Sequence, residues 1–305
     1  MSDTKTHSYN LMLDFSRATG QAATPAEHRT LWDSWSLANL TYPPVVRVAD
    51  DICGVACEWI STPDLAESRP AIIFLHGGGF SSGSSTSHLP MIAHVAAATD
   101  CRVLAVNYRL SPEHRFPAQI EDAVAVYRGL LQRGTANTQL AMMGDSAGGG
   151  LVFSTLLQAR NIGLPMPAAA VGIGPWVDLA LTGATMVANA ASDPLVIREQ
   201  MRAGAEFFLD GVNPYLPLAS PIYADLSGLP PTLIQVSSSE ALLDDAVRLV
   251  GRAQQCGVLA QLKVWPDLVH GWHQCSAFLP EGQLALDEIR DFLNALNSWG
   301  HLSTS

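Results

Sequence analysis

Short runs of consecutive apolar residues alternate along this chain with segments whose apolar residues recur every three or four positions. Apolar runs bounded by glycine or turn residues are typical of strands buried on both faces of a parallel sheet. The pattern predicts six such strands, at residues 71–75, 102–107, 139–143, 168–173, 232–236 and 261–265. Because helical segments lie between or after most of these runs, the chain is predicted to have an α/β fold.

Four helices are predicted from the three- and four-residue spacing of apolar side chains. The first follows Pro117, a residue type that suits the first position of a helix, and the second follows Ser146 directly. A weaker apolar stripe spans residues 243–254, and a closing helix is predicted at residues 286–296. We interpret these stripes as faces that pack on the core.

Two apolar segments lie outside the alternation of strands and helices. The first, about residues 1–42, contains the sequence Thr-Pro-Ala-Glu at residues 24–27, a capping-box pattern that predicts the start of a helix. The second spans about residues 181–215. Both are expected to pack on other parts of the chain. The aromatic residues of these segments that are expected to form an apolar lid are Trp32, Trp35, Phe207 and Phe208.

Composition and charge narrow the class of ligand. The 305 residues are 48% hydrophobic and 15% charged, which supplies a packed core and excludes a disordered chain. Lys and Arg number 17 against 28 Asp and Glu, so the formal net charge is −11, and the basic residues are scattered. Nucleic acid and anionic membranes are therefore not expected as partners. We expect one domain and a neutral small-molecule substrate.

Cysteine usage and hydropathy predict a cytoplasmic protein. The five cysteines contain no repeated Cys-x-x-Cys pair, as is typical of reduced cytosolic chains. The first ten residues lack the apolar core of a signal peptide, and no later run is long enough to span a membrane. The sequence leaves open whether the protein forms a homo-oligomer.

The sequence Gly-Asp-Ser-Ala-Gly at residues 144–148 matches the pattern G-x-S-x-G. It lies between a predicted strand and a predicted helix, a context that predicts a sharp turn exposing the hydroxyl of Ser146. The small neighbours tolerate a strained backbone, and the helix N-terminus favours an anionic intermediate. A glycine-rich turn with a solvent-facing serine is the alternative. We interpret Ser146 as a candidate nucleophile.

The sequence His-Gly-Gly-Gly-Phe at residues 76–80 follows the predicted strand at residues 71–75. Three glycines leave backbone N–H groups bare, and an acyl-transfer enzyme needs such donors where the carbonyl oxygen becomes negative. Phosphate-binding loops also use glycine, but neither a Gly-Lys-Ser/Thr sequence nor a dinucleotide fingerprint follows. Taken alone, the motif fits an ordinary loop as well as an oxyanion hole.

These two motifs, together with Tyr-Arg-Leu-Ser-Pro-Glu-His at residues 108–114, resemble the bacterial hormone-sensitive-lipase family of α/β-hydrolase esterases. The motifs occur in the family's order, and the resemblance runs from about residue 70 to the end. It implies an eight-stranded, mostly parallel sheet flanked by helices, with a helical cap built from the N-terminus and a later insertion. The two apolar segments fit that cap. No metal or organic cofactor is implied.

A serine nucleophile needs a neighbouring base, and this fold places nucleophile, acid and histidine in that order along the chain. Three histidines follow Ser146, namely His270, His273 and His301. His270 comes shortly after a predicted strand, in a His-Gly-aromatic context similar to that of the family, and is the predicted base. His273 is the fallback, whereas His301 follows the closing helix. No zinc site is expected, because the HEXXH pattern is absent.

The acid is expected after the strand at residues 232–236, where many relatives carry aspartate. This chain reads Ser-Ser-Ser-Glu there, and Glu240 falls in the strand-to-helix loop, so Glu240 is the predicted acid and Asp244 the alternative. Asp193 stands in an Asp-Pro-Leu sequence similar to that of the family, but it precedes this strand and is rejected. Asp145 and Glu113 are expected to hold loops, with Arg109 or Arg115 as possible ion-pair partners for the latter.

The residues predict acyl transfer to Ser146, with His270 as base and then acid and Glu240 orienting it. The N–H groups of Gly78, Gly79 and Ala147 are expected to hold the oxyanion. Expected substrates are short to medium acyl esters or lactones. An amidase or peptidase with the same triad, or a non-catalytic small-molecule-binding protein, are the alternatives. The predicted substrate contacts are Phe80, Trp32, Trp35, Phe207 and Phe208.

Overall fold

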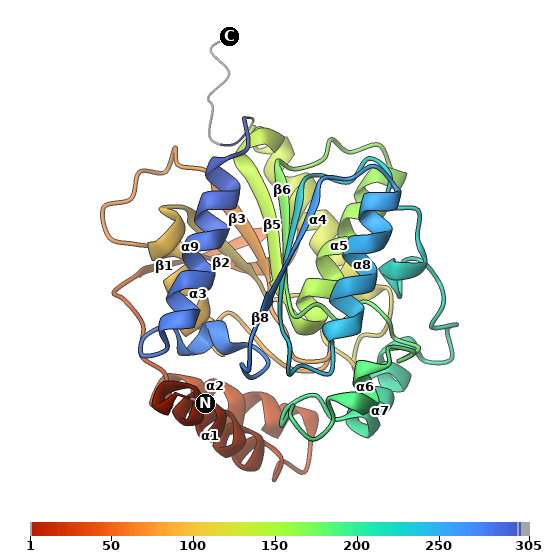
Figure 1. Ribbon diagram of the computed structural model, residues 1–305. Coiled ribbons are helices and arrows are strands. Elements are labelled where there is room, and N and C mark those ends of the chain that lie inside the picture. Colours follow the sequence, from red (N-terminus) through yellow and green to blue (C-terminus); the bar gives the residue numbers. More distant parts are fainter. Residues whose placement is uncertain (1, 298, 300–305) are drawn as a thin grey trace.

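An eight-stranded sheet forms the centre of the molecule (Figure 1). The computed structural model describes residues 2–297 and 299 of the 305-residue chain. The strand order is β1-β2-β4-β3-β5-β6-β7-β8. β2 runs antiparallel to both of its neighbours, β1 and β4, and all other adjacent strands are parallel. The predicted α/β class and the mostly parallel, eight-stranded sheet are confirmed.

All six strands predicted from apolar runs are present, and their ends differ from the predicted ones by two residues or fewer. They are β3 (Ala71–Leu75), β4 (Arg102–Val106), β5 (Leu140–Asp145), β6 (Ala169–Ile173), β7 (Thr232–Ser237) and β8 (Ala260–Trp265). The apolar pattern does not predict the hairpin of β1 (Val46–Ile52) and β2 (Val55–Ser61). β1 lies at the sheet edge with most residues exposed, so it has no continuous apolar run.

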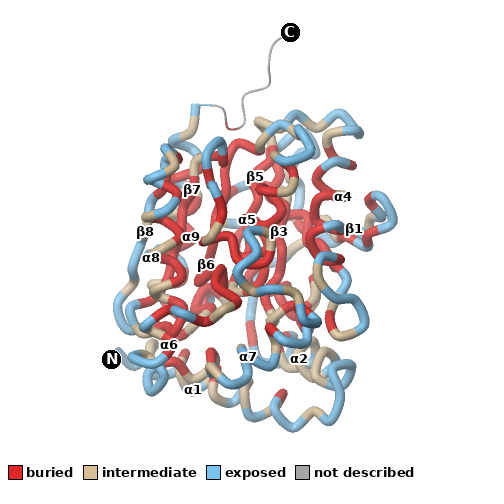
Figure 2. The backbone as a smooth tube through the Cα atoms, turned by 90° about the vertical axis from the view of Figure 1, so that its right-hand side faces the viewer, coloured by how far each residue is buried: buried red, intermediate tan, exposed pale blue. Residues whose placement is uncertain are grey.

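Helices cover both faces of the sheet (Figure 1). α3 (Leu89–Thr99) and α9 (Pro280–Asn294) pack on one face, and α4 (Ala118–Gln132), α5 (Ser146–Asn161) and α8 (Leu243–Gln255) pack on the other. Figure 2 shows the strands and the inward sides of these helices as buried. α3 was not predicted, because it is buried nearly all round and lacks the polar face that reveals a helical period. Pro117 stands at the N-cap of α4, one position before the expected one.

Four helices lie at the carboxyl end of the parallel strands (Figure 1). They are α1 (Asp3–Thr19), α2 (Pro25–Asn39), α6 (Thr185–Ala188) and α7 (Arg198–Leu209). The predicted helix start at residues 24–27 is confirmed, since the hydroxyl of Thr24 accepts the N–H of Glu27 at 3.2 Å. Two segments far apart in sequence thus meet at one end of the sheet. Within residues 2–297 and 299, no helix has the length and apolar composition needed to cross a membrane.

Candidate active site

Ser146 stands at the turn where β5 ends and α5 begins. Its φ of 53° lies in the left-handed region, which residues with a side chain rarely adopt, so the turn is strained. A Cβ at Gly148 would lie 2.0 Å from the carbonyl oxygen of Leu75, and one at Gly144 would lie 2.5 Å from that of Gly148. Only glycine fits at both positions. This tight packing presents the serine at the N-terminus of α5, where partial positive charge gathers.

His270 and Glu240 form a pair in the loops that follow β8 and β7. The Nδ1–H group of His270 donates to Oε2 of Glu240 at 2.5 Å, and Oε1 of the fully buried Glu240 accepts the N–H of Ser237 at 2.7 Å. Burial by itself lowers the pKa of His270, but the negative charges around it, that of Glu240 above all, raise it, and the net result is a raised pKa. Because Nδ1 is engaged, Nε2 is the ring nitrogen left to exchange a proton with a reacting group.

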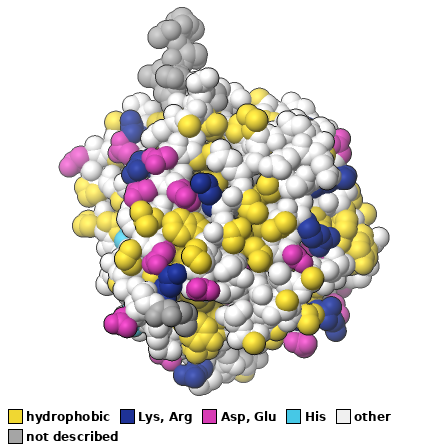
Figure 3. Space-filling model, viewed as in Figure 1, with side chains coloured by type: hydrophobic (Ala, Val, Ile, Leu, Met, Phe, Trp, Pro, Cys, Tyr) yellow, Lys and Arg dark blue, Asp and Glu magenta, His cyan; other side chains and the backbone are white. Residues whose placement is uncertain are grey.

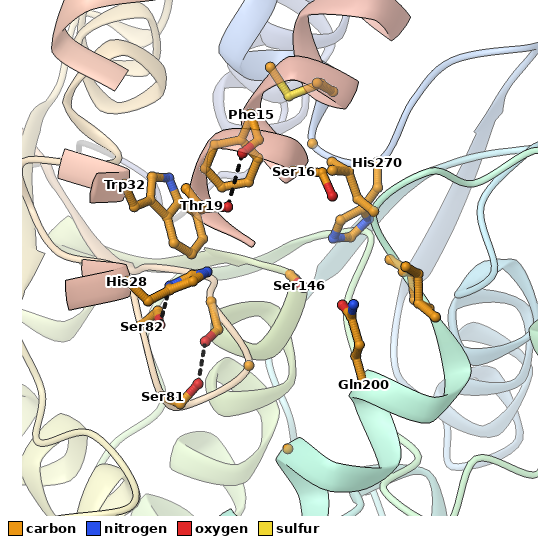
Figure 4. Close-up of a pocket in the computed structure, with 18 of the residues that line it drawn as sticks. Phe15, Ser16, Thr19, His28, Trp32, Ser81, Ser82, Ser146, Gln200 and His270 are labelled. Carbon is orange, nitrogen blue, oxygen red and sulfur yellow. Dashed lines mark hydrogen bonds between the residues drawn. The ribbon is translucent and has the colours of Figure 1, made fainter. Parts of the chain in front are cut away.

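A cavity of about 290 Å³ brings these residues together with the helices at the strand ends (Figure 4). Ser146 lies between His28 and Ser82 on one side and His270 and Gln200 on the other. The wall is mainly apolar and is formed chiefly by Met12, Phe15, Trp32, Trp35, Trp176 and Leu195. An apolar cavity with a few convergent polar groups is typical of a small-molecule site.

The glycine loop after β3 borders the cavity beside Ser146. The N–H of Gly77 donates to Oδ1 of Asp145 at 2.9 Å, which fixes the loop to the end of β5. Gly78 and Gly79 line the cavity at φ values of 114° and 61°, and their N–H groups donate to no acceptor in the described part of the chain. Ala147 is buried in the first turn of α5. The loop therefore offers uncommitted donors next to the candidate nucleophile.

Known proteins share both the sequence and the fold of this chain. A family model described as alpha/beta hydrolase fold matches residues 72–274. The acetyl-hydrolase of Streptomyces hygroscopicus is 41% identical over 265 residues, which cover 87% of this chain and 87% of that protein. A crystal structure of an esterase from the bacterial hormone-sensitive lipase (HSL) family superimposes with a TM-score of 0.93 at 40% identity, covering 97% of this chain and 99% of the other. The chain belongs to this HSL family.

Membership of the HSL family makes the protein a carboxylic ester hydrolase. A further relative, the esterase of Acinetobacter venetianus, is 34% identical over 233 residues, which cover 76% of this chain and 77% of that protein. A catalytic triad and an oxyanion hole are typical of the family, and the non-catalytic alternative is not retained. Over the described ranges, no group of three or more His, Cys, Asp or Glu side chains could hold a metal ion.

Only two of the five predicted substrate contacts, Trp32 and Trp35, line the cavity of this HSL-family esterase. Phe80, Phe207 and Phe208 do not, which corrects the prediction. Phe80 and Phe208 are buried and stack with ring centroids 4.0 Å apart, whereas Phe207 is 60% exposed. Adjacent residues of a helix point in different directions, so on α7 one phenylalanine faces the core and the other faces solvent.

The alternative base and acid of the esterase are engaged elsewhere. His273 is buried, with Nε2 lying 2.8 Å from Oε1 of Gln235, and burial lowers its pKa to about 3. Asp244 accepts two backbone N–H groups at the start of α6, at 2.6 and 3.2 Å, and therefore caps that helix. His301 lies outside the described residues.

Glu113 holds its loop through an ion pair with Arg29 of α2, at 2.8 Å. The partners considered from the sequence, Arg109 and Arg115, bind Asp122 and Asp210 instead. Arg29 and Glu113 are 84 positions apart, and no sequence spacing indicates a contact over that separation. The interaction ties the N-terminal segment to the motif at residues 108–114.

Three polar residues near the site were not predicted from the sequence. His28 and Gln200 line the cavity, and the fully buried His88 places Nε2 3.3 Å from Oδ2 of Asp145, the residue before Ser146. They come from α2, α7 and the residue preceding α3. No motif marks them, so only the fold reveals that they lie near Ser146.

Proposed function

We propose that this HSL-family esterase is a serine carboxylesterase that hydrolyses short to medium acyl esters through an acyl-enzyme on Ser146. The observation that carries the proposal is the 2.5 Å contact between His270 and Glu240 at the cavity that Ser146 also lines. A base oriented by a buried carboxylate beside a strained serine is the arrangement that activates a hydroxyl. Relatives named acetyl-hydrolase and esterase agree with it.

Acylation begins when Nε2 of His270 takes the proton of the Ser146 hydroxyl while the oxygen attacks the ester carbonyl carbon. The electron pair of the C=O bond moves to the carbonyl oxygen, where N–H groups of Gly78, Gly79 and Ala147 stabilise the charge. The carboxylate of Glu240 stabilises the imidazolium that has formed. Donors set in place before the reaction cost no reorganisation, so their effect is largest in the transition state.

The end of acylation and the deacylation that follows it use the same groups. The bond to the alcohol oxygen breaks as His270 returns its proton to the leaving alcohol. Water then gives a proton to Nε2 and attacks the acyl carbon. The second tetrahedral intermediate collapses as its bond to the Ser146 oxygen breaks and His270 returns the proton to that oxygen, which releases the acid and regenerates the Ser146 hydroxyl. His270 alternates between base and acid, so one histidine serves both halves of the reaction.

We further propose that the chain is one α/β-hydrolase domain whose cap consists of about residues 1–42 and 181–215. α1 and α2 lie with α6 and α7 at one end of the sheet (Figure 1), and residues from both segments line the cavity. A cap in this position limits the access of bulk water to the acyl-enzyme.

Charge favours a neutral ester as the substrate. The net charge is −11, and on the face shown in Figure 3 the basic side chains lie singly among acidic and apolar ones. The polar side chains that line the cavity include the uncharged Ser16, Thr19, Gln200 and Gln274. An anionic substrate would find little electrostatic attraction in such a site.

All five cysteines have free thiols. Three of them, Cys57, Cys101 and Cys275, are buried, and burial raises the pKa of each thiol, so these are protonated at neutral pH. Free thiols are typical of a reducing compartment, and on this basis we propose a cytoplasmic location.

Activity on p-nitrophenyl esters is expected to peak at acyl chains of about C4 to C8 and to fall for chains of about C16, because a cavity of about 290 Å³ cannot bury a long chain. The measurement is kcat/KM across the ester series. A profile that rises to the longest chain, with activation at an oil–water interface, would show a lipase instead.

A fluorophosphonate probe tests the nucleophile directly. It phosphonylates an activated serine oxygen with loss of fluoride, and we expect one label per chain in the wild type and none in Ser146→Ala. Intact-mass spectrometry measures the stoichiometry, and peptide mapping locates the label. A label that persists in Ser146→Ala would place the reactive serine elsewhere.

A further inference from the structure

The loop that carries Glu240, residues 238–242 between β7 and α8, is held by side chains of the segment 185–193. This segment contains α6 and the turn that follows it. Four consecutive backbone carbonyls of the loop each accept a hydrogen bond from it. Asn189 donates to the carbonyls of Ser238 and Glu240, Ser192 to that of Ser239, and Thr185 to that of Ala241, at 2.8 to 2.9 Å.

Asp193 completes this contact with a buried carboxylate whose two oxygens face different parts of the chain. Oδ1 accepts the N–H groups of Leu195 and Val196, at 3.0 Å each, and these residues line the cavity. Oδ2 accepts the N–H of Ala241, the residue after Glu240, at 2.9 Å. Asp193 is only 4% exposed. One side chain therefore bridges the wall of the substrate cavity and the loop of the acid.

A carboxylate in this position costs desolvation energy that a neutral side chain would avoid. Its charge also acts on the catalytic pair, because burial weakens screening by solvent. Burial lowers the pKa of His270, and the charges of Glu240, Asp193 and Asp145 raise it. Asp145 faces the histidine from the end of β5, and His273, from the turn after β8, is kept uncharged by burial.

We propose that Asp193 is a positioning residue for the catalytic acid: it holds the Glu240 loop in register with His270 and adds a second negative charge that favours the imidazolium. The inference rests on the proposed triad and extends it to a third carboxylate, supplied by the segment inserted between β6 and β7. The backbone N–H groups that Asp193 binds need only an acceptor, which a neutral side chain could supply. The effect of its charge on His270 explains why a carboxylate is buried there instead. Asp193, the first residue of the Asp-Pro-Leu sequence, thus positions the catalytic acid Glu240 but is not itself the acid.

Asp193→Asn tests the proposal. Asparagine keeps one acceptor oxygen and puts an amide, which cannot accept, where the second oxygen stood. We expect kcat to fall roughly 10- to 100-fold, since small displacements of a catalytic group have effects of that size, with a smaller change in KM. Because His270 must be neutral to act as base, loss of a charge that raises its pKa should move the acid limb of the kcat/KM profile to lower pH.

Asp244→Asn is the matched control. Asp244, in the first turn of α8, also accepts two backbone N–H groups, at the start of α6, but its charge is not among those that raise the pKa of His270. We expect it to lower Tm while leaving kcat and the acid limb near those of the wild type. Equal kcat losses in both variants with no displacement of the acid limb would reduce Asp193 to a structural residue and overturn the proposal.

Asn189→Ala keeps the inference testable if Asp193→Asn does not fold. It removes two hydrogen bonds to the Glu240 loop without changing a charge, so kcat should fall several-fold at unchanged KM, and wild-type kcat would overturn the proposal. Fluorophosphonate labelling of each variant tests the Ser146 nucleophile separately from the role of Asp193. Loss of labelling in Ser146→Ala upholds the nucleophile whatever the Asp193 variant does.

Discussion

Ser146→Ala is expected to lower kcat for p-nitrophenyl butyrate roughly a millionfold, by analogy with removal of the serine nucleophile in subtilisin. Without the hydroxyl, His270 has no group to deprotonate that can form an acyl-enzyme, and only the oxyanion donors and substrate binding remain. Steady-state hydrolysis with purified variant and wild type measures the loss.

The stability of Ser146→Ala is expected to match that of the wild type. The side-chain oxygen of Ser146 makes no hydrogen bond within residues 2–297 and 299, and alanine meets the same backbone strain at a φ of 53°. Ser16→Ala, which also removes a hydroxyl from the cavity wall, is the matched control and should change kcat only a few-fold. Turnover retained by Ser146→Ala, at equal Tm, would disprove the nucleophile.

Glu240→Gln is expected to lower kcat by about 10,000-fold, the size of effect seen when the acid of a serine protease triad becomes an amide. Glutamine preserves the shape of the side chain but can donate to Nδ1 of His270, which favours the tautomer whose Nε2 carries the proton. It also removes the largest of the charges that raise the pKa of His270, so that pKa falls and the acid limb of kcat/KM moves to lower pH.

Asp244→Asn distinguishes the two candidate acids. Asp244 lies in the first turn of α8 and accepts N–H groups at the start of α6, so its amide variant loses a favourable charge there and is expected to lose about 0.3 to 1 kcal/mol of unfolding free energy and little activity. Urea unfolding and kcat at the pH optimum measure the two effects. If Asp244→Asn lost activity and Glu240→Gln kept it, the acid would be Asp244. Near-wild-type kcat in both variants would place the acid elsewhere in the chain.

The candidate catalytic residues can be recognised in the sequence from the residues next to them. The sequence around Ser146 predicts a strained turn because glycines lie at the positions where a side chain would clash with the neighbouring strand. Chain order and the residues next to His270 and Glu240 likewise singled out the pair that the structure joins at 2.5 Å. The six buried strands were predictable for a similar reason, since a run of consecutive apolar residues needs no partner to be recognised.

The sequence by itself determined the α/β class, the parallel strands and the residues that stand at their carboxyl ends, because each depends on a few neighbouring residues. Only the tertiary structure decided which of two adjacent phenylalanines on α7 is buried, which arginine pairs with Glu113, and that Asp193 lies against the loop of Glu240. These facts depend on contacts between segments tens of residues apart. Such contacts leave no periodicity in the sequence, since hydrophobic burial and hydrogen bonding act between whatever groups the completed fold brings together.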